Sequence, residues 1–193
     1  MTNDPVLLLI VLNYCGIGLL TAFFFRRDVQ YTPQWWATAL PHVLAPCFLV
    51  TSRVLGLDPL LSGKALPALS LAAVFLSAAS LALMFFAWGT HRIPLAHFHQ
   101  HDDAPVRLVT HGAYSRIRHP FYASYLLLYL AAAACFPHPV TALLFGYTLV
   151  TLTLTAAREE QRLSNSEFGA EYQQYLARSG RFFPRLAAPQ PVD

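Results

Sequence analysis

Long apolar blocks separated by short polar segments organise this chain. A helix needs about 20 mostly apolar residues to cross a bilayer, and five windows approach that length: residues 5–25, 35–55, 65–88, 121–136 and 140–157. The third window contains no charge, and its alanines and serines permit close helix packing. The pattern predicts an all-α integral membrane protein with about five transmembrane helices.

Prolines occur at two informative places in this pattern. Pro41 and Pro46 lie inside the second window, so we expect that helix to be kinked or broken, with neighbouring helices or water satisfying the freed carbonyls. Only Pro137, His138 and Pro139 separate the last two windows. A link this short predicts a tight antiparallel hairpin.

Composition agrees with a membrane protein, because 55% of the residues are hydrophobic, 12% are charged and the mean hydropathy is +0.43. The first window lacks a basic start and a small-residue cleavage site, so we expect a retained helix and not a signal peptide. We therefore predict a single membrane domain over residues 1–193, with three spans in residues 1–88. Polar chemistry gathers in residues 89–186, which include the hairpin 121–157 and the C-terminal tail.

Basic residues are divided unevenly between alternate polar segments. With five spans, one set of segments holds eleven lysines and arginines, and the other set holds two, Arg53 and Lys64. Cytoplasmic segments carry the excess of positive charge in membrane proteins. We therefore expect the N-terminus to lie outside, and the loop 89–120 and the tail 158–193 to share the cytoplasmic face. If the second window did not cross the membrane, the basic residues would no longer divide in this way. The bias therefore supports a second span.

The net charge of +3 is modest, and its concentration on one face fits attraction to anionic membrane lipid better than nucleic-acid binding. The three cysteines, Cys15, Cys47 and Cys135, lie inside predicted spans at unrelated spacing. We expect them to be small packing residues, neither metal ligands nor disulfide partners. The oligomeric state is left open by the sequence.

A histidine-rich segment, residues 91–103, is the one candidate metal site. Alternating histidines beside two aspartates are ligands for divalent metals, and they are His91, His97, His99, His101, Asp102 and Asp103. Their spacing matches no closed zinc site, and Pro94 favours an irregular loop at the membrane interface. We therefore predict no metal site, and keep a non-enzymatic metal-binding protein as an alternative.

The fifth helix should continue past its apolar window, which places Glu159 and Glu160 about one turn beyond the hydrocarbon. Across the same boundary, Arg116 and Arg118 could face these acids and form a charged pocket roofed by apolar helices. The alternative is that the acids are solvated and pair at helical spacing with Arg158 and Arg162, but exposed pairs of this kind contribute little.

A further helix is predicted in the tail over residues 166–176. Phe168, Tyr172, Tyr175 and Leu176 fall on one of its faces. Such an amphipathic helix suits an interface helix or a lid, or simple packing.

Four motifs of the second half occur in a specific order. Residues 108–114 read LVTHGAY, residues 118–122 read RHPFY, Glu159 and Glu160 follow, and residues 168–172 read FGAEY, with Tyr175 and Pro184 beyond. Together they resemble the isoprenylcysteine carboxyl methyltransferase family and the related phospholipid N-methyltransferases, over roughly residues 85–186. The family usually has glycine where this chain has Ser124. Serine is still small, so we expect close helix approach to survive there.

The resemblance implies an integral-membrane enzyme that binds S-adenosyl-L-methionine from the cytosol and a lipophilic acceptor from the bilayer. Arg118 is expected to orient an acceptor carboxylate, because guanidinium matches that group with two parallel hydrogen bonds. Glu159 or Glu160 would hold the ribose hydroxyls or the ammonium of the cofactor. The candidate catalytic residues are Arg118, Glu160 and Glu159; the candidate cofactor-binding residues are Tyr114, His119, Pro120, Tyr122, Glu159, Tyr172 and Tyr175.

The expected reaction is carboxyl O-methylation of an isoprenylcysteine-like substrate. An alternative is N-methylation of a phospholipid or small amine, in which His119 or Glu159 would take a proton. A second alternative is a sterol-type reductase, which resembles this chain around the arginine, histidine, proline and tyrosine cluster. Such an enzyme would use NADPH, whose extra phosphate calls for more basic residues than the short loop has.

Overall fold

A computed structural model describes residues 4–24, 33–61, 63–90 and 108–185, and this part of the chain contains six α-helices, one short 3-10 helix and no strand. The elements are α1 (Asp4–Phe24), α2 (Pro33–Val54), α3 (Ala65–Thr90), η1 (Gly112–Ser115), α4 (Pro120–Cys135), α5 (Pro139–Ser164) and α6 (Gly169–Arg178). All-α architecture is confirmed, and each of the five apolar windows forms a long helix.

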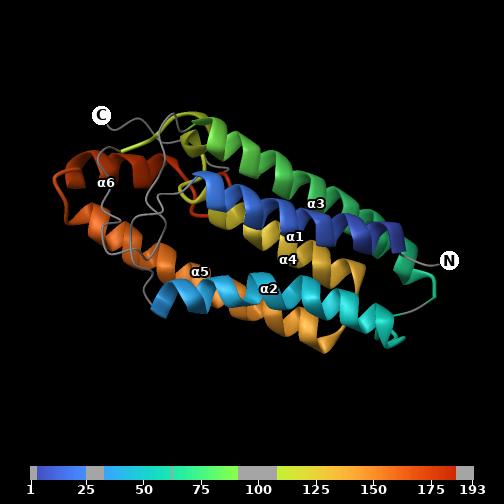
Figure 1. Ribbon diagram of the computed structural model, residues 1–193. Helices are drawn as coiled ribbons and strands as arrows, with labels where there is room; N and C mark the ends of the chain where they lie inside the picture. The colour runs from blue at the N-terminus through green and yellow to red at the C-terminus, as the bar shows by residue number, and fades with distance from the viewer. Residues whose placement is uncertain (1–3, 25–32, 62, 91–107, 186–193) are drawn as a thin grey trace.

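The five long helices run back and forth as an elongated bundle, and α6 lies at the end of the bundle where α5 finishes (Figure 1). The beginning of α1 lies at the opposite end, where the Asp4 carboxylate accepts two hydrogen bonds from Arg53 of α2. Acidic and basic side chains therefore occur at both ends of the bundle, with long apolar helices between them.

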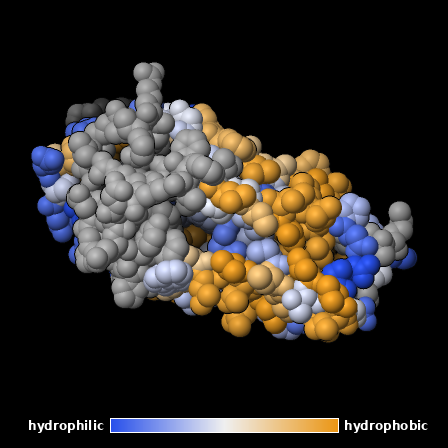
Figure 2. All heavy atoms as spheres, viewed as in Figure 1, coloured by the Kyte–Doolittle hydropathy of each residue, from blue (hydrophilic) through white to orange (hydrophobic). Residues whose placement is uncertain are grey.

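Two helices, α3 and α5, are long and apolar enough to cross a membrane. Only 28% of the apolar window of each is buried inside the protein, and Leu71, Phe75, Leu143 and Val150 are among their exposed side chains. Figure 2 shows hydrophobic surface spread over the long helices on the face in view. A helix in the core of a soluble protein would be mostly buried, so this exposure is typical of helices surrounded by lipid.

The second window was expected to be kinked or broken; α2 continues through both prolines, so it is not broken. Proline at position 41 removes the amide that would bond to the carbonyl of Ala37, four residues earlier. The Tyr147 hydroxyl of α5 donates to that carbonyl at 3.0 Å. A neighbouring helix thus satisfies the freed acceptor, as expected.

Small polar residues join α3 to its neighbours. The Asn13 amide of α1 donates to the carbonyl and the hydroxyl of Ser77, at 3.1 and 2.9 Å. The Ser80 hydroxyl donates to the backbone carbonyl of Ser124 in α4 at 2.8 Å, and Ser124 is fully buried. Serine at position 124 therefore permits the expected close approach of α3 and α4.

The predicted hairpin between α4 and α5 is confirmed. Pro139 occupies the first turn of α5, where its missing amide costs nothing. His138 caps the helix by accepting from the amide of Val140, and Thr141 accepts from the amide of His138. The cysteine expectation is only partly right, since Cys135 is buried whereas Cys15 and Cys47 are exposed on the bundle surface.

Candidate functional site

The site is built where the segment before α4 meets the tail after α6. The backbone amide of Arg118 donates to the carbonyl of Gly180 at 2.8 Å, and the amide of Gly180 donates to the carbonyl of Arg116 at 3.0 Å. These bonds pair Ile117 with Gly180 in a short parallel bridge. The loop 89–120 and the tail 158–193 were expected on one face, and the described parts of the two segments do meet at one end of the molecule.

Glu160 is the centre of the charged cluster. Its Oε1 accepts from Nε of Arg118 at 2.9 Å and from Nε of Arg181 at 3.1 Å, and its Oε2 accepts from Nη2 of Arg181 at 2.6 Å. The residue is only 8% exposed. Glu160 is therefore not a solvated acid paired with Arg158 or Arg162, and that alternative is wrong for this residue.

His119 lies between the two acids. Its Nε2 is 3.2 Å from Oε1 of Glu160, and its Nδ1 is 3.4 Å from Oε2 of Glu159. Carboxylate oxygens accept hydrogen bonds, so the doubly protonated imidazolium satisfies both contacts. Burial alone would lower the pKa of His119, but the hydrogen bonds and negative charges of Glu159 and Glu160 outweigh it and raise the pKa above 6.5.

The pKa of Glu160 shifts in the opposite direction. Its side chain lies beyond the apolar part of α5, and its burial by itself would raise the pKa. Hydrogen bonds from His119, Arg181 and Arg118 outweigh that effect and hold the pKa far below its usual value. Both shifts favour the charged form of each group, so the cluster is a set of mutually neutralising charges.

Glu159 occupies a different environment one residue earlier. Its Oε1 accepts from the Tyr122 hydroxyl at 2.6 Å, and 28% of its side chain is exposed. The ring of Tyr122 stacks parallel to that of His119, with 5.3 Å between the centroids. Glu159 is thus the more accessible of the two acids, and has room to accept further hydrogen bonds.

The tyrosines of α6 hold the tail against the segment before α4. Tyr172 and Tyr175 are buried, and the Tyr175 hydroxyl donates to the backbone carbonyl of Tyr114 at 2.5 Å. Burial raises the pKa of Tyr175 to about 12, so this hydroxyl remains a donor at neutral pH. The predicted apolar face of the tail helix is confirmed, and it faces the bundle.

The sequence prediction chose one wrong arginine. Arg116, which was expected beside the two acids, is exposed. Arg181 of the tail binds Glu160 in its place. Position 180 explains how Arg181 reaches the cluster, because a Cβ on Gly180 would lie 1.9 Å from the carbonyl oxygen of Phe183. Only glycine allows the chain to turn so closely there. The glycine directly before an arginine was the one sequence signal that could have indicated this turn.

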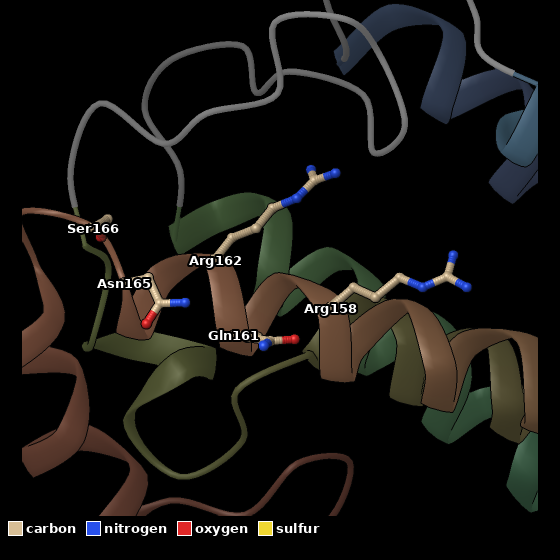
Figure 3. A pocket seen from close by; sticks show the side chains of 5 residues that line it. All are labelled: Arg158, Gln161, Arg162, Asn165 and Ser166. Carbon is tan, nitrogen blue, oxygen red and sulfur yellow. The ribbon is translucent and has the colours of Figure 1, made fainter.

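Of the predicted site residues, Arg118, His119, Tyr122, Glu159 and Glu160 share one cluster. Pro120 begins α4 as expected, and the remaining three tyrosines lie around the tail contact. A pocket of about 490 Å³ lies elsewhere (Figure 3), and its lining residues are Arg158, Gln161, Arg162, Asn165 and Ser166. Arg158 and Arg162 lie on the side of α5 opposite Glu160, because each is about half a turn from it, and Asn165 and Ser166 directly follow the end of the helix.

The histidine-rich segment, residues 91–103, lies outside the described residues, so its metal-binding alternative is untested. Within the described part of the chain, no group of three or more histidine, cysteine, aspartate or glutamate side chains could hold a metal ion. The chain matches no protein-family model, and a search of curated proteins finds no significant match.

Proposed function

We propose that this chain is an integral-membrane enzyme that transfers a methyl group from S-adenosylmethionine to the carboxylate of a lipophilic, isoprenylcysteine-like acceptor. The observation that carries the proposal is the convergence of separated motifs on one cluster. Arg118, His119 and Tyr122 directly contact Glu159 or Glu160, about 40 positions later in the chain. Structural ion pairs also exist in proteins, but a buried cluster at the edge of apolar helices is a candidate functional site.

We propose further that the chain crosses the membrane five times, which would place this chemistry at the cytoplasmic face. The five long helices alternate in direction (Figure 1), and the charged cluster lies at the end that the excess of arginines marks as cytoplasmic. A soluble cofactor would then reach the cluster from water, and a lipophilic acceptor would reach it from the bilayer. The N-terminus would lie on the outside.

The described residues fit S-adenosylmethionine in their donors and acceptors. The partly exposed carboxylate of Glu159 can accept from ribose hydroxyls or from an ammonium group, while Tyr122 fixes its orientation. When bound, the cofactor supplies a methyl carbon whose bond to sulfur breaks as a carboxylate oxygen bonds to it, with the electron pair left on sulfur. This displacement needs alignment and exclusion of water more than proton transfer.

Arg118 would orient the acceptor carboxylate, and Glu160 would position Arg118. The bonds to Glu160 and Ser179 use Nε and Nη1 of Arg118. Within the described part of the chain, Nη2 makes no hydrogen bond, which leaves it as a donor to a substrate oxygen. Glu160 and Ser179 fix the direction in which this donor extends.

The state of His119 favours a carboxylate acceptor over an amine acceptor. An amine must lose a proton before or during methylation, so its enzyme needs an unprotonated base. The hydrogen bonds from His119 to Glu159 and Glu160 raise its pKa and favour the protonated imidazole, which makes the ring less available as a free base. A carboxylate acceptor already carries the attacking charge near neutral pH and needs no such base.

The test is to incubate purified protein with methyl-labelled cofactor and either a farnesylcysteine derivative or extracted membrane lipids. We expect label in the farnesylcysteine fraction, released as methanol by base, as from an ester. Arg118→Gln should abolish this transfer while cofactor binding, measured by calorimetry, persists; Arg116→Gln is the matched control and should retain transfer. Label that stays with lipid amines after base treatment, or unchanged transfer by Arg118→Gln, would contradict the assignment.

A further inference from the structure

Three hydroxyl groups lie close together inside the bundle, away from the charged cluster. They belong to Tyr14 of α1, Tyr129 of α4 and Thr148 of α5, whose exposed fractions are 1%, 2% and 5%. The rings of Tyr14 and Tyr129 pack edge to face, with 5.4 Å between their centroids. The hydroxyls of Tyr129 and Thr148 lie near each other without reaching hydrogen-bond geometry. In the part of the chain that the structure describes, none of the three hydroxyls has a hydrogen-bond partner.

This hydroxyl cluster of Tyr14, Tyr129 and Thr148 lies near the middle of the bundle's length. At about 1.5 Å per residue, Tyr14 is about 15 Å from the start of α1, and Tyr129 is about 14 Å from the start of α4 at the other end. In a five-pass topology that position is the middle of a hydrocarbon core about 30 Å thick. A buried polar group without a partner costs free energy there, because bulk water does not reach it. A ligand that supplies hydrogen bonds would remove this cost.

A small cavity indicates which ligand fits. Its lining residues are Pro41, Tyr147, Thr148, Thr151 and Leu152, and its volume is about 10 Å³. A space of that size holds about one water molecule and nothing larger. Thr148 is shared by this cavity and the hydroxyl cluster. A buried water typically makes about three hydrogen bonds, which is the number of hydroxyls in the cluster.

We propose that Tyr14, Tyr129 and Thr148 bind an ordered water molecule that joins α1, α4 and α5 in the interior of the membrane domain. Water and hydroxyl groups each donate and accept, so one water molecule can bond to all three side chains. Polar contacts of this kind hold transmembrane helices together. The inference rests on the five-pass topology in the proposed function, but not on methyl transfer.

A fourth helix holds Tyr14 in place. Nε2 of His42 in α2 donates to the backbone carbonyl of Tyr14 at 2.9 Å, and the two rings lie 5.0 Å apart. A Cβ on Gly18 would lie 3.5 Å from the same imidazole nitrogen, so a small residue one turn after Tyr14 leaves room for the histidine. The position of the Tyr14 hydroxyl is thus fixed from the side of α2.

The test is hydroxyl-radical footprinting of the full chain in detergent, with radicals generated by X-ray pulses and the products read by mass spectrometry. Radicals formed from a bound water modify the side chains beside it, so we expect Tyr14 and Tyr129 to be modified although both are buried. Met84 is the internal control, because it is 1% exposed and is oxidised more easily than tyrosine, and it should stay unmodified. Thr148→Val should lose most of the modification at both tyrosines. Thr153→Val, which removes a hydroxyl bonded to its own helix, should not.

Thermal unfolding gives a second readout whose sign separates the alternatives. If water bridges the cluster, Tyr14→Phe and Tyr129→Phe each leave it with fewer partners, and both unfolding midpoints should fall. The double variant should then fall by less than the sum of the two, because both changes act on one water. If the hydroxyls are simply unpaired, either substitution removes a buried polar group at no loss, and the midpoint should rise.

Protection of both tyrosines from radicals, or a raised midpoint in either phenylalanine variant, would overturn the water site. Protected tyrosines with lowered midpoints would show that the hydroxyls bond directly to one another. Methyl transfer measured on the same samples separates the two proposals. Thr148 lies about 18 Å along α5 from Glu160, so Thr148→Val should keep the labelled ester product while it loses the water. Absence of transfer by the unaltered protein would contradict the proposed function alone.

Discussion

Near the end of α5, charged side chains are buried and paired on one side of the helix and exposed on the other. On the inner side, Glu160 is buried and its charge is balanced by Arg118, Arg181 and His119. On the outer side, Arg158 is exposed and faces a polar pocket. Residues 158–162 read REEQR, and their composition alone cannot reveal this division. The contrast teaches that helical phase, and the path of a distant tail, decide which charges are buried in pairs and which face the surface.

The largest difference in stability is expected between two substitutions that each remove one charge, one on the inner side of α5 and one on the outer side. Glu160→Gln removes the carboxylate from the buried pair with Arg118, whose side chains are only 11% and 10% exposed, and from the more exposed Arg181. Breaking such a pair costs about 3–5 kcal/mol. Thermal unfolding in detergent should therefore show a much lower midpoint.

The matched control is Arg158→Gln, whose side chain is exposed. A surface change of this kind usually stays within about 0.5 kcal/mol, so its unfolding midpoint should match that of the unaltered protein. Equal destabilisation by the two substitutions would refute the distinction between the inner and outer sides.

A second test addresses the turn that delivers Arg181 to the inner side. Gly180→Ala places a methyl group against the carbonyl of Phe183, and the tail must shift. Overpacking of this kind costs about 1–3 kcal/mol. Gly146→Ala in α5 is the control, since nothing lies within 4 Å of the place that its new methyl group would take, and it should be neutral or stabilising by about 0.5–1 kcal/mol. If both alanine variants unfold alike, the close turn does not hold the cluster together.

The smallest expected effect is a pH dependence. The pKa of His119 is raised in the folded protein above its ordinary value of 6.5, so folding favours the protonated ring. Its contribution to stability is complete below pH 6.5 and is lost as pH rises through the folded pKa, with a slope of at most about 1.4 kcal/mol per pH unit. Unfolding midpoints should therefore fall over that range.

His119→Gln should remove this fall in the unfolding midpoint. Glu160 works in the other direction, because its lowered pKa gives a contribution that is complete above the ordinary value of 4.5 and is lost only as pH falls. The two effects are thus separated along the pH axis. An identical pH profile for His119→Gln and the unaltered protein would mean that the imidazole carries no charge in the fold.

Much of the architecture follows from hydropathy. The five apolar windows correspond to the five long helices, because an uninterrupted apolar run of that length favours a helix, and α5 continues beyond its apolar part as expected. The prolines of α2 do not break the helix, and Tyr147 on α5 donates to the carbonyl that Pro41 leaves free. Local sequence locates the freed carbonyl but does not identify the side chain that donates to it.

The site was predictable only in part, because local motifs identify some of its residues but not the contacts between distant segments. Arg118, Glu159 and Glu160 lie in recognisable motifs, and the structure brings them together. Arg181 was missed because its place depends on the parallel pairing of Ile117 with Gly180, which joins segments about 60 positions apart. Charge and spacing alone made Arg116 an equally reasonable partner.

The order of the cluster's members along the chain has a consequence for biogenesis. Arg118 and His119 are synthesised before Glu160, whereas Arg181 is synthesised after it. The carboxylate cannot acquire its full set of partners until the tail has been made and has folded back, so this end of the bundle is the last to be completed. A nascent chain that stopped at position 178 would contain all five long helices, with its central acid open to water on the side that Arg181 later covers.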